Sequence, residues 1–194
     1  YVEIDGRPCV LEMVSHIEGG RWVDVDGSRL LLERSAPNGD AAYFDSLTGA
    51  RSRHYYEEYL TGMEHMDGVV IIDADNFKHI NDTYGHPVGD AALRTIAGAI
   101  SSCVRGSDIL VRYGGDEFLL LFPQIPEQAL YDRIEQIRAA VRASKVDGYP
   151  DIHLSVSLGG VYQVEPLTEA VRKADWKMYR DKANKPRLER ESHT

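Results

Sequence analysis

Two short apolar runs, at residues 109–113 and 118–122, flank the dipeptide Gly114-Gly115 and constrain the fold of this 194-residue chain more than any other feature. Both runs are rich in Ile, Leu, Val and Phe, which is typical of buried β-strands. Paired glycines adopt the backbone angles of a tight turn without the steric cost of a side chain. The sequence therefore predicts an antiparallel hairpin, with Asp116 and Glu117 where its second strand begins.

The segments around this hairpin alternate between strand-like and helix-like patterns. Apolar runs at 69–72 and 152–161 predict two more strands. Four segments carry apolar side chains at helical spacing: Tyr56, Tyr59, Leu60 and Met63; Leu93, Ile96, Ala97, Ile100 and Val104; Leu130, Ile134, Ile137 and Val141; Leu167, Ala170, Val171, Ala174 and Met178. The central order, strand–helix–strand–strand–helix–strand, predicts an α+β, ferredoxin-like (βαββαβ) fold, the palm of nucleotide polymerases and cyclases.

Residues 1–43 differ from the rest and predict a β-rich appendage to a main domain at 44–190. Hairpin signals occur at Asp5-Gly6, Gly19-Gly20 and Asp26-Gly27. So short a segment does not bury a core of its own. Residues 4–12 are similar to the closing strands of PAS-type sensors, and a β ribbon packed on the main domain explains them equally well. The chain begins at Tyr1, so we expect a longer protein with an upstream sensor and, with it, a route to membrane attachment.

Composition narrows the class of partner. Lys and Arg number 22 against 31 Asp and Glu, for a formal net charge of −9. A protein that binds the nucleic-acid backbone normally presents a basic face, so we expect no nucleic-acid partner. No apolar stretch reaches the length of a membrane span, and no secretory signal is visible. With only Cys9 and Cys103 present, a reducing, cytoplasmic location is expected.

Acidic residues follow two of the predicted strands. Asp73 and Asp75 come at the end of the run at 69–72, and Asp116 and Glu117 open the second hairpin strand. Carboxylates at strand ends are suited to a hard cation such as Mg²⁺. Neighbouring strand residues point to opposite faces, so Asp116 and Glu117 are not expected to share one role. Polar turn residues in an ordinary hairpin, and a capping role for Asp75 at the next helix, are the structural alternatives.

Five motifs occur in an order and spacing that resemble the GGDEF family of diguanylate cyclases. They cover residues 45–187: Asp45-Ser-Leu-Thr-Gly49, the stretch 73–86, Gly89-Asp90, Gly114-Gly-Asp-Glu-Phe118, and Ala174-Asp-Trp-Lys-Met-Tyr179 with Lys182. The resemblance implies an enzyme that condenses two GTP molecules into cyclic di-GMP and two pyrophosphates. It also implies that two domains face each other as a homodimer, because each domain holds one GTP.

The resemblance assigns metal and phosphate contacts. Asp73 and Asp116 would be carboxylate ligands of two Mg²⁺ (or Mn²⁺) ions, with the backbone carbonyl of Ala74 as a further ligand. Glu117 would assist with the proton or the metal. Backbone amides at Phe77 and Lys78 would hold the terminal phosphates, as exposed N–H groups at a helix start do.

Further positions complete the substrate site that the resemblance implies. Gly114 and Gly115 would let the chain pass close to the phosphates, and Lys182 would add a positive charge there. Asn81 and Asp90 would read guanine, because a carboxylate accepts from the ring N–H and exocyclic amine that adenine lacks.

The segment Arg105-Gly-Ser-Asp108 is similar to the inhibitory RxxD site of the family, where product binds and stops turnover. A cation after a helix end is also favoured on its own, so a structural role for Arg105 is the alternative. Gln136 stands where a supporting arginine is expected, and Arg133 or Arg138 is a candidate to compensate.

Two further departures concern the phosphates and the function itself. Lys185-Pro186 replaces an expected Gly-Arg pair, which leaves Lys185 or Arg187 as substitute phosphate ligands. Intact Asp73, Asp116 and Glu117 favour an active cyclase over a receptor that binds GTP or cyclic di-GMP without turnover. A purely structural dimerisation domain leaves these carboxylates unexplained, and guanylate or adenylate cyclase chemistry leaves the Gly-Gly-Asp-Glu-Phe hairpin unexplained.

Overall fold

The computed structural model describes residues 2–4, 7–9, 22–25, 28–31 and 40–185, apart from residue 64. The chain divides into two compact units, Tyr1–Asn38 and Gly39–Thr194. In the first unit, strands β1 (Val2–Ile4) and β2 (Arg7–Cys9) pair antiparallel, as do β3 (Trp22–Val25) and β4 (Ser28–Leu31). The three expected turns, Asp5-Gly6, Gly19-Gly20 and Asp26-Gly27, all lie outside the described residues.

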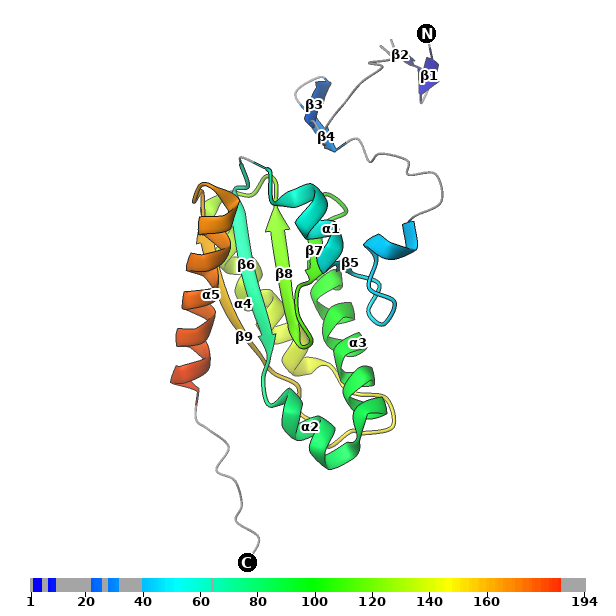
Figure 1. Cartoon of the computed structure of the whole chain (residues 1–194), viewed down its shortest axis with the longest axis vertical. Coiled ribbons are helices and arrows are strands. Elements are labelled where there is room, and N and C mark those ends of the chain that lie inside the picture. The colour runs from blue at the N-terminus through cyan, green and yellow to red at the C-terminus, as the bar shows by residue number, and fades with distance from the viewer. Residues whose placement is uncertain are drawn as a thin grey trace, which may run out of the picture. The chain divides into compact units, whose positions relative to one another are not determined.

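The second unit contains one mixed sheet with helices on both faces (Figure 1). Its short lead-in elements are η1 (Asp40–Tyr43), β5 (Arg51–Ser52), α1 (Arg53–Tyr55) and the π-helical turn η2 (Tyr56–Leu60). The remaining elements are β6 (Gly68–Ala74), α2 (Phe77–Tyr84), α3 (His86–Ser102), β7 (Ile109–Arg112), β8 (Glu117–Phe122), α4 (Glu127–Ala143), β9 (Val156–Tyr162) and α5 (Leu167–Asn184).

The strand order β5-β7-β8-β6-β9 confirms the ferredoxin-like prediction. From β6 to β9 the elements follow the βαββαβ order, and β6, β7, β8 and β9 pair antiparallel. The hairpin predicted from 109–122 is β7–β8. Strand β5, which pairs parallel with β7, was not predicted. Strand β6 has neighbours along its whole length on both sides, so residues at its carboxyl end are held in register twice.

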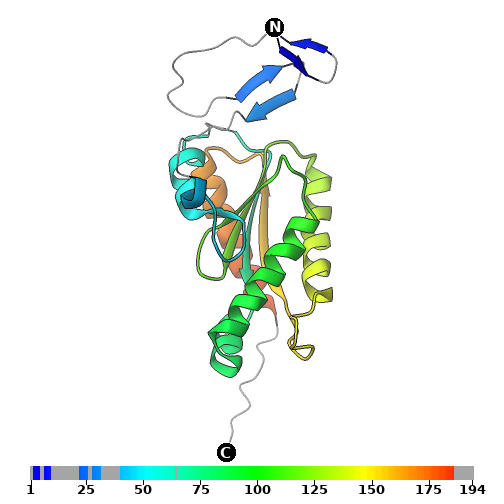
Figure 2. The ribbon, with the colours of Figure 1, turned by 90° about the vertical axis from the view of Figure 1, so that its right-hand side faces the viewer.

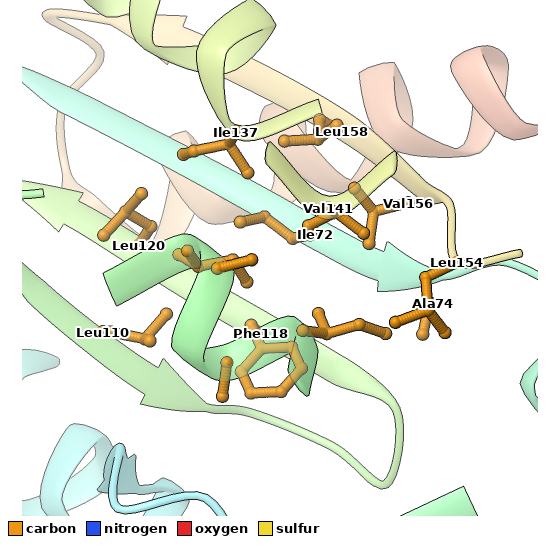
Figure 3. Packing of buried hydrophobic residues seen from close by; sticks show 14 of the residues in the cluster. Ile72, Ala74, Leu110, Phe118, Leu120, Ile137, Val141, Leu154, Val156 and Leu158 are labelled. Atoms are coloured by element: carbon orange, nitrogen blue, oxygen red, sulfur yellow. The ribbon is translucent and has the colours of Figure 1, made fainter. Parts of the chain in front are cut away.

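Alternation along β6 separates the two faces of the sheet. Val70, Ile72 and Ala74 belong to the core cluster that also contains residues of α3 and α4. Figure 3 shows Ile72 near Ile137 and Val141 of α4. The opposite face is covered by α5, and Figure 2 shows α4 and α5 on opposite sides of the sheet. Asp73 alternates with Ile72 and Ala74, so it lies on the α5 face.

Helix α5 packs directly on β9. A Cβ atom added at Gly159 would lie 2.1 Å from the carbonyl oxygen of Ala174 and 2.2 Å from the amide nitrogen of Met178. These neighbours are helix backbone and cannot move aside, so this position needs glycine. The close approach brings the last turn of α5 to the carboxyl end of β6.

Two predicted segments differ in detail from the structure. The expected strand 152–161 begins only at Val156; Ile152 and Leu154 are buried in the preceding loop, where apolar side chains imitate a strand pattern. The expected helical face Tyr56–Met63 is instead the π-helical turn η2, which ends at Leu60. Of the helices within the described ranges, none is both long and apolar enough to cross a bilayer.

Candidate active site

The carboxylates predicted from the two strand ends come together at one end of the sheet. Asp73 pairs with Glu117 across the β6–β8 ladder and with Ser157 across the β6–β9 ladder. Next to it, the amide nitrogen of Ala74 donates to the carbonyl oxygen of Asp116, over 3.0 Å. The β-hairpin and the central strand therefore bring Asp73, Asp116 and Glu117 into one small region.

Electrostatics in this region are unfavourable for so many negative charges. Burial raises the pKa of Asp73, which is 6% exposed, and the charges of Asp116 and Asp75 raise it further against the opposing effect of Lys182. Burial also raises the pKa of Glu117, and the charges of Asp73 and Asp116 add to that effect. Buried carboxylates that repel one another favour a bound cation.

The donor set fits a hard divalent cation, because Asp73 and Asp116 supply carboxylate oxygens beside the backbone of Ala74. Among residues 40–185 without 64, no group of three or more His, Cys, Asp or Glu side chains is preassembled as a metal cage.

Lys182 reaches the same place from α5. Its Nζ lies 2.6 Å from Oδ1 of Asp73, and its side chain is 45% exposed. Burial acts to lower the pKa of Lys182, but the hydrogen bond and charge of Asp73 outweigh it, so the pKa is raised. The lysine is therefore fully charged at neutral pH, and its partly exposed side chain lies beside the cluster of Asp73, Asp116 and Glu117.

The glycine turn has two different surroundings. A Cβ at Gly114 would lie 2.5 Å from Oε2 of Glu117, so glycine here makes room for that side chain. A Cβ at Gly115 would meet nothing within 4 Å. The predicted role of close approach to a ligand is thus compatible with Gly115, while Gly114 also serves the placement of Glu117.

The residues expected to hold phosphate and guanine lie on α2 and α3. Asn76, with φ of 55°, precedes α2 and makes no side-chain cap, so the first N–H groups at Phe77 and Lys78 have no side-chain acceptor from it. Asn81 stands against α3: a Cβ at Gly89 would lie 1.9 Å from its Oδ1. The exposed Asp90 follows directly. Asn81 of α2 therefore packs against α3 at Gly89, the residue before Asp90.

Asp75 does not cap α2, contrary to the structural alternative considered for it. Its carboxylate accepts from Ser155 Oγ (2.7 Å), Ser157 Oγ (2.6 Å) and Lys185 Nζ (2.6 Å). Burial acts to raise the pKa of Asp75, but these hydrogen bonds, that of Lys185 first, outweigh it and lower the pKa. Lys185 is thus occupied by Asp75 and does not extend toward the carboxylate group. Arg187, the other expected phosphate ligand, lies outside the described residues.

The segment from Arg105 to Asp108 forms a closed turn between α3 and β7. The Arg105 amide donates to Asp108 Oδ2 (2.8 Å), and the Asp108 amide donates to the Arg105 carbonyl oxygen (3.0 Å). On α4, Gln136 is exposed, and Arg133 donates to the carbonyl oxygen of Cys103 near this turn. Arg138 pairs with Asp181 of α5, with Nη1 3.0 Å from Oδ2.

The sequence motifs do not predict the structural roles of three residues in this region. Gly89 belongs to a motif, but the motif does not reveal that Asn81 packs against it; a glycine inside a helical pattern is nevertheless a usable signal for close packing. Lys185 and Asp181 were not expected to fix the end of α5. Their partners are distant in the chain, so no local pattern points to them.

Known proteins are similar to this chain in sequence and in fold. The family model described as "Diguanylate cyclase, GGDEF domain" matches residues 42–187. Diguanylate cyclase DgcM of Escherichia coli is 35% identical over 149 residues, covering 73% of this chain and 36% of that protein. The cyclic di-GMP phosphodiesterase PdeR of E. coli is 36% identical over 143 residues, covering 70% of this chain and 22% of that protein. The chain thus spans only about a third or less of the length of these relatives.

A solved structure agrees with the sequence matches. The GGDEF domain of DgcB from Caulobacter crescentus, in complex with c-di-GMP, superposes with a TM-score of 0.65 at 27% identity, covering 73% of this chain and 91% of that one. The family model covers well over half of the chain and coincides with the unit that holds the carboxylates, Lys182 and the α2–α3 corner. The chain therefore belongs to the GGDEF diguanylate cyclase family.

Proposed function

We propose that residues 44–190 form a catalytic domain that condenses two GTP molecules into cyclic di-GMP and two pyrophosphates. The observation that carries this proposal is the meeting of Asp73, Asp116 and Glu117 at one sheet end with Lys182 beside them. In a purely structural hairpin, placing mutually repelling carboxylates in a half-buried site would cost folding free energy without compensation. Such an arrangement is expected where a cation and a polyphosphate are bound.

Each residue has a proposed task. Asp73, Asp116 and the Ala74 carbonyl hold two Mg²⁺ (or Mn²⁺) ions, which when bound lower the pKa of the attacking hydroxyl and neutralise phosphate charge. Lys182 exchanges its contact with Asp73 for the triphosphate. Amides at Phe77 and Lys78 bind terminal phosphate oxygens. Glu117, whose pKa burial raises, assists with the proton or the metal.

Selection of guanine is assigned to the α2–α3 corner. The carboxylate of Asp90 accepts from the N–H groups on the Watson–Crick edge of guanine, and the amide of Asn81 adds a second contact. Adenine would leave Asp90 without a donor, which is costly for a charged group withdrawn from water. GTP is therefore the proposed substrate, and ATP is rejected.

The reaction needs two copies of the domain. The 3′-hydroxyl oxygen of each GTP attacks the α-phosphorus of the other, forming a P–O bond as pyrophosphate leaves. One domain holds one GTP, so we propose a homodimer whose sites face each other. An upstream sensor in a longer cytoplasmic or membrane-attached protein would control that pairing. Cyclic di-GMP bound at Arg105 and Asp108 would inhibit the cyclase reaction.

A receptor without turnover is the second candidate. It is favoured by the match to PdeR, a relative named as a phosphodiesterase rather than a cyclase. A GGDEF domain in such a protein is compatible with nucleotide sensing. The intact carboxylate set of this chain favours the cyclase.

Incubation of the purified chain with GTP and Mg²⁺, followed by mass spectrometry for cyclic di-GMP, tests the proposal. Asp116→Asn removes a metal ligand and is expected to abolish product. Asp132→Asn is the matched control, because Asp132 is exposed on α4 and, among residues 40–185 without 64, its carboxylate accepts from Gln128 alone. A second version of the assay uses the chain fused to a dimeric coiled coil, which holds two copies together. Absence of product from the forced dimer, with GTP still bound, would establish the receptor instead.

A further inference from the structure

Two lysines at the carboxyl end of α5 contact two aspartates at the carboxyl end of β6; Lys182 lies within the helix, and Lys185 directly follows its last residue, Asn184. Lys182 Nζ lies 2.6 Å from Asp73 Oδ1, and Lys185 Nζ lies 2.6 Å from Asp75 Oδ2. Their partners, Asp73 and Asp75, are two residues apart at the end of β6 and point to the same face of the sheet. The two ion pairs therefore run side by side between one helix end and one strand end.

The Lys185 pair is closed to ligands. The ammonium group of lysine has three N–H donors, and Nζ of Lys185 has three acceptors: Asp75 Oδ2, the Val156 carbonyl oxygen (2.5 Å) and Ser157 Oγ (3.1 Å). Side chains of Lys185 and Asp75 are only 29% and 8% exposed. No donor of Lys185 is left for a phosphate.

The Lys182 pair is open. Within the described ranges, Asp73 Oδ1 is the one hydrogen-bond acceptor of Lys182, so two of its donors remain for a ligand. Its position depends on the final turn of α5, and helix ends fray when nothing holds them. The structure provides two anchors there. Asp181 accepts from Arg138 and from the Leu158 amide (3.0 Å), and Lys185 is held as described.

We propose that Lys185 is a positioning residue, which fixes the end of α5 to β6 through Asp75 and thereby holds Lys182 at the phosphate side of the site. We call Lys185, Asp75, Ser155 and Ser157 the α5 clamp. The inference deepens the proposed GTP site and rests on it. It also gives Lys185 a role different from the direct phosphate contact that the family resemblance suggests for Lys185 or Arg187.

Amide hydrogen exchange of residues 179–185, without nucleotide, tests the clamp itself. Lys185→Met and Asp75→Asn should each speed exchange in this turn by roughly tenfold or more, because either change removes a charge-assisted hydrogen bond. Lys177→Met is the matched control: it also removes a lysine hydrogen bond from α5, to the Gly160 carbonyl oxygen, and should leave residues 179–185 unchanged. Unaltered exchange in Lys185→Met would overturn the clamp whether or not the protein binds GTP.

Affinity for GTP without metal, compared with affinity for guanosine, tests the consequence for Lys182. Lys185→Met and Asp75→Asn should each weaken GTP binding by roughly tenfold, the scale of one charge-assisted hydrogen bond, and leave guanosine binding unchanged. The double variant should be no weaker than either single variant, because both act through one contact. Ser155→Ala, a smaller change, should give a smaller loss of the same kind.

The Asp75→Asn variant separates positioning from direct contact. If Lys185 itself bound phosphate, releasing it from Asp75 would maintain or strengthen GTP affinity, and that result would overturn the proposal. Equal losses for GTP and guanosine would also overturn it, since they would indicate general unfolding. Failure of the wild-type chain to prefer GTP over ATP would contradict the proposed function, while the exchange experiment would still decide the clamp.

Discussion

Arg112 and Asp45 form a two-pronged ion pair, with Arg112 Nη1 3.1 Å from both carboxylate oxygens of Asp45. Nη2 of the same guanidinium donates to the Gly115 carbonyl oxygen, over 2.8 Å. Burial acts to raise the pKa of Asp45, but hydrogen bonds from Thr48 and Arg112 outweigh it and lower the pKa. One side chain thus ties the turn that leads into the domain to the glycine turn of the proposed active site.

Replacing this arginine should cost both stability and activity. Arg112→Lys has a single point charge and cannot reach Asp45 and Gly115 in the same fork geometry. We expect a loss of about 2 kcal/mol in the free energy of unfolding, measured by urea denaturation, because a charge-assisted contact of two mostly buried groups is lost. Cyclase activity should fall with it. Arg53→Lys is the control: its pair with Glu57 is more than half exposed on both sides and should change stability little.

Gly89→Ala should impair guanine recognition specifically. The new Cβ would overlap the Asn81 amide, which must turn away from the α2–α3 corner. The expected result is about a tenfold higher KM for GTP with a smaller preference over ITP, which lacks the exocyclic amine. Gly98→Ala on the same helix is the control, since a Cβ there meets nothing within 4 Å and alanine favours helix. Equal effects of the two variants would refute the steric explanation.

Glu117→Gln should stabilise the metal-free protein while lowering activity. A raised carboxyl pKa means that ionising Glu117 costs folding free energy, and this cost grows as pH rises above the ordinary value of 4.5. Removing the charge should therefore raise the melting temperature at neutral pH, with little gain near pH 4. Thermal melts in EDTA across this pH range measure the difference. Addition of Mg²⁺ should stabilise the wild type more than the variant.

Gln136→Arg should strengthen product inhibition. Gln136 is exposed on α4, and a guanidinium there would add bidentate contacts to a phosphate or guanine held near Arg105. We expect about a tenfold lower inhibitory concentration of cyclic di-GMP, measured in the cyclase assay. Gln128→Arg, also exposed on α4, controls for added charge and should leave inhibition as it is.

His65 should make stability depend on pH. Its ring nitrogens contact Glu165 Oε1 (2.5 Å) and Asp67 Oδ1 (2.9 Å), and these partners, Glu165 first, raise its pKa above the ordinary 6.5. A raised histidine pKa gives stability that is fully present below the ordinary pKa and is lost as pH rises through the raised one. His65→Gln should therefore melt below the wild type in acid and approach it at alkaline pH. A constant difference across this range would contradict the titration.

Local patterns predicted the fold because its signals are local. The apolar runs of β6, β7 and β8 are bounded by glycines and carboxylates, and the helical faces of α3, α4 and α5 are regular. Local patterns gave a wrong strand boundary where buried residues are not hydrogen-bonded to a neighbouring strand. Ile152 and Leu154 are buried, but they lie before β9, which begins at Val156.

Some residues of the candidate site can be predicted from local motifs, and others cannot. Motifs indicate Asp73, Asp116 and Lys182, and the structure brings these residues together. The partners of Asp75 lie 80, 82 and 110 residues away, so only the three-dimensional arrangement of β6, β9 and α5 reveals them. Without those partners, Lys185 resembled a free cation available for phosphate.

The central place of β6 has a consequence for synthesis on the ribosome. Its neighbour β8 follows within about fifty residues, but β9, which pairs with the other edge, and α5, which supplies Lys182, are made last among these elements. Until then, one edge of β6 has unpaired backbone groups, and non-local pairing of this kind folds slowly. Asp73 therefore emerges long before Lys182, and the ion pair between them forms only after both β9 and α5 have been made.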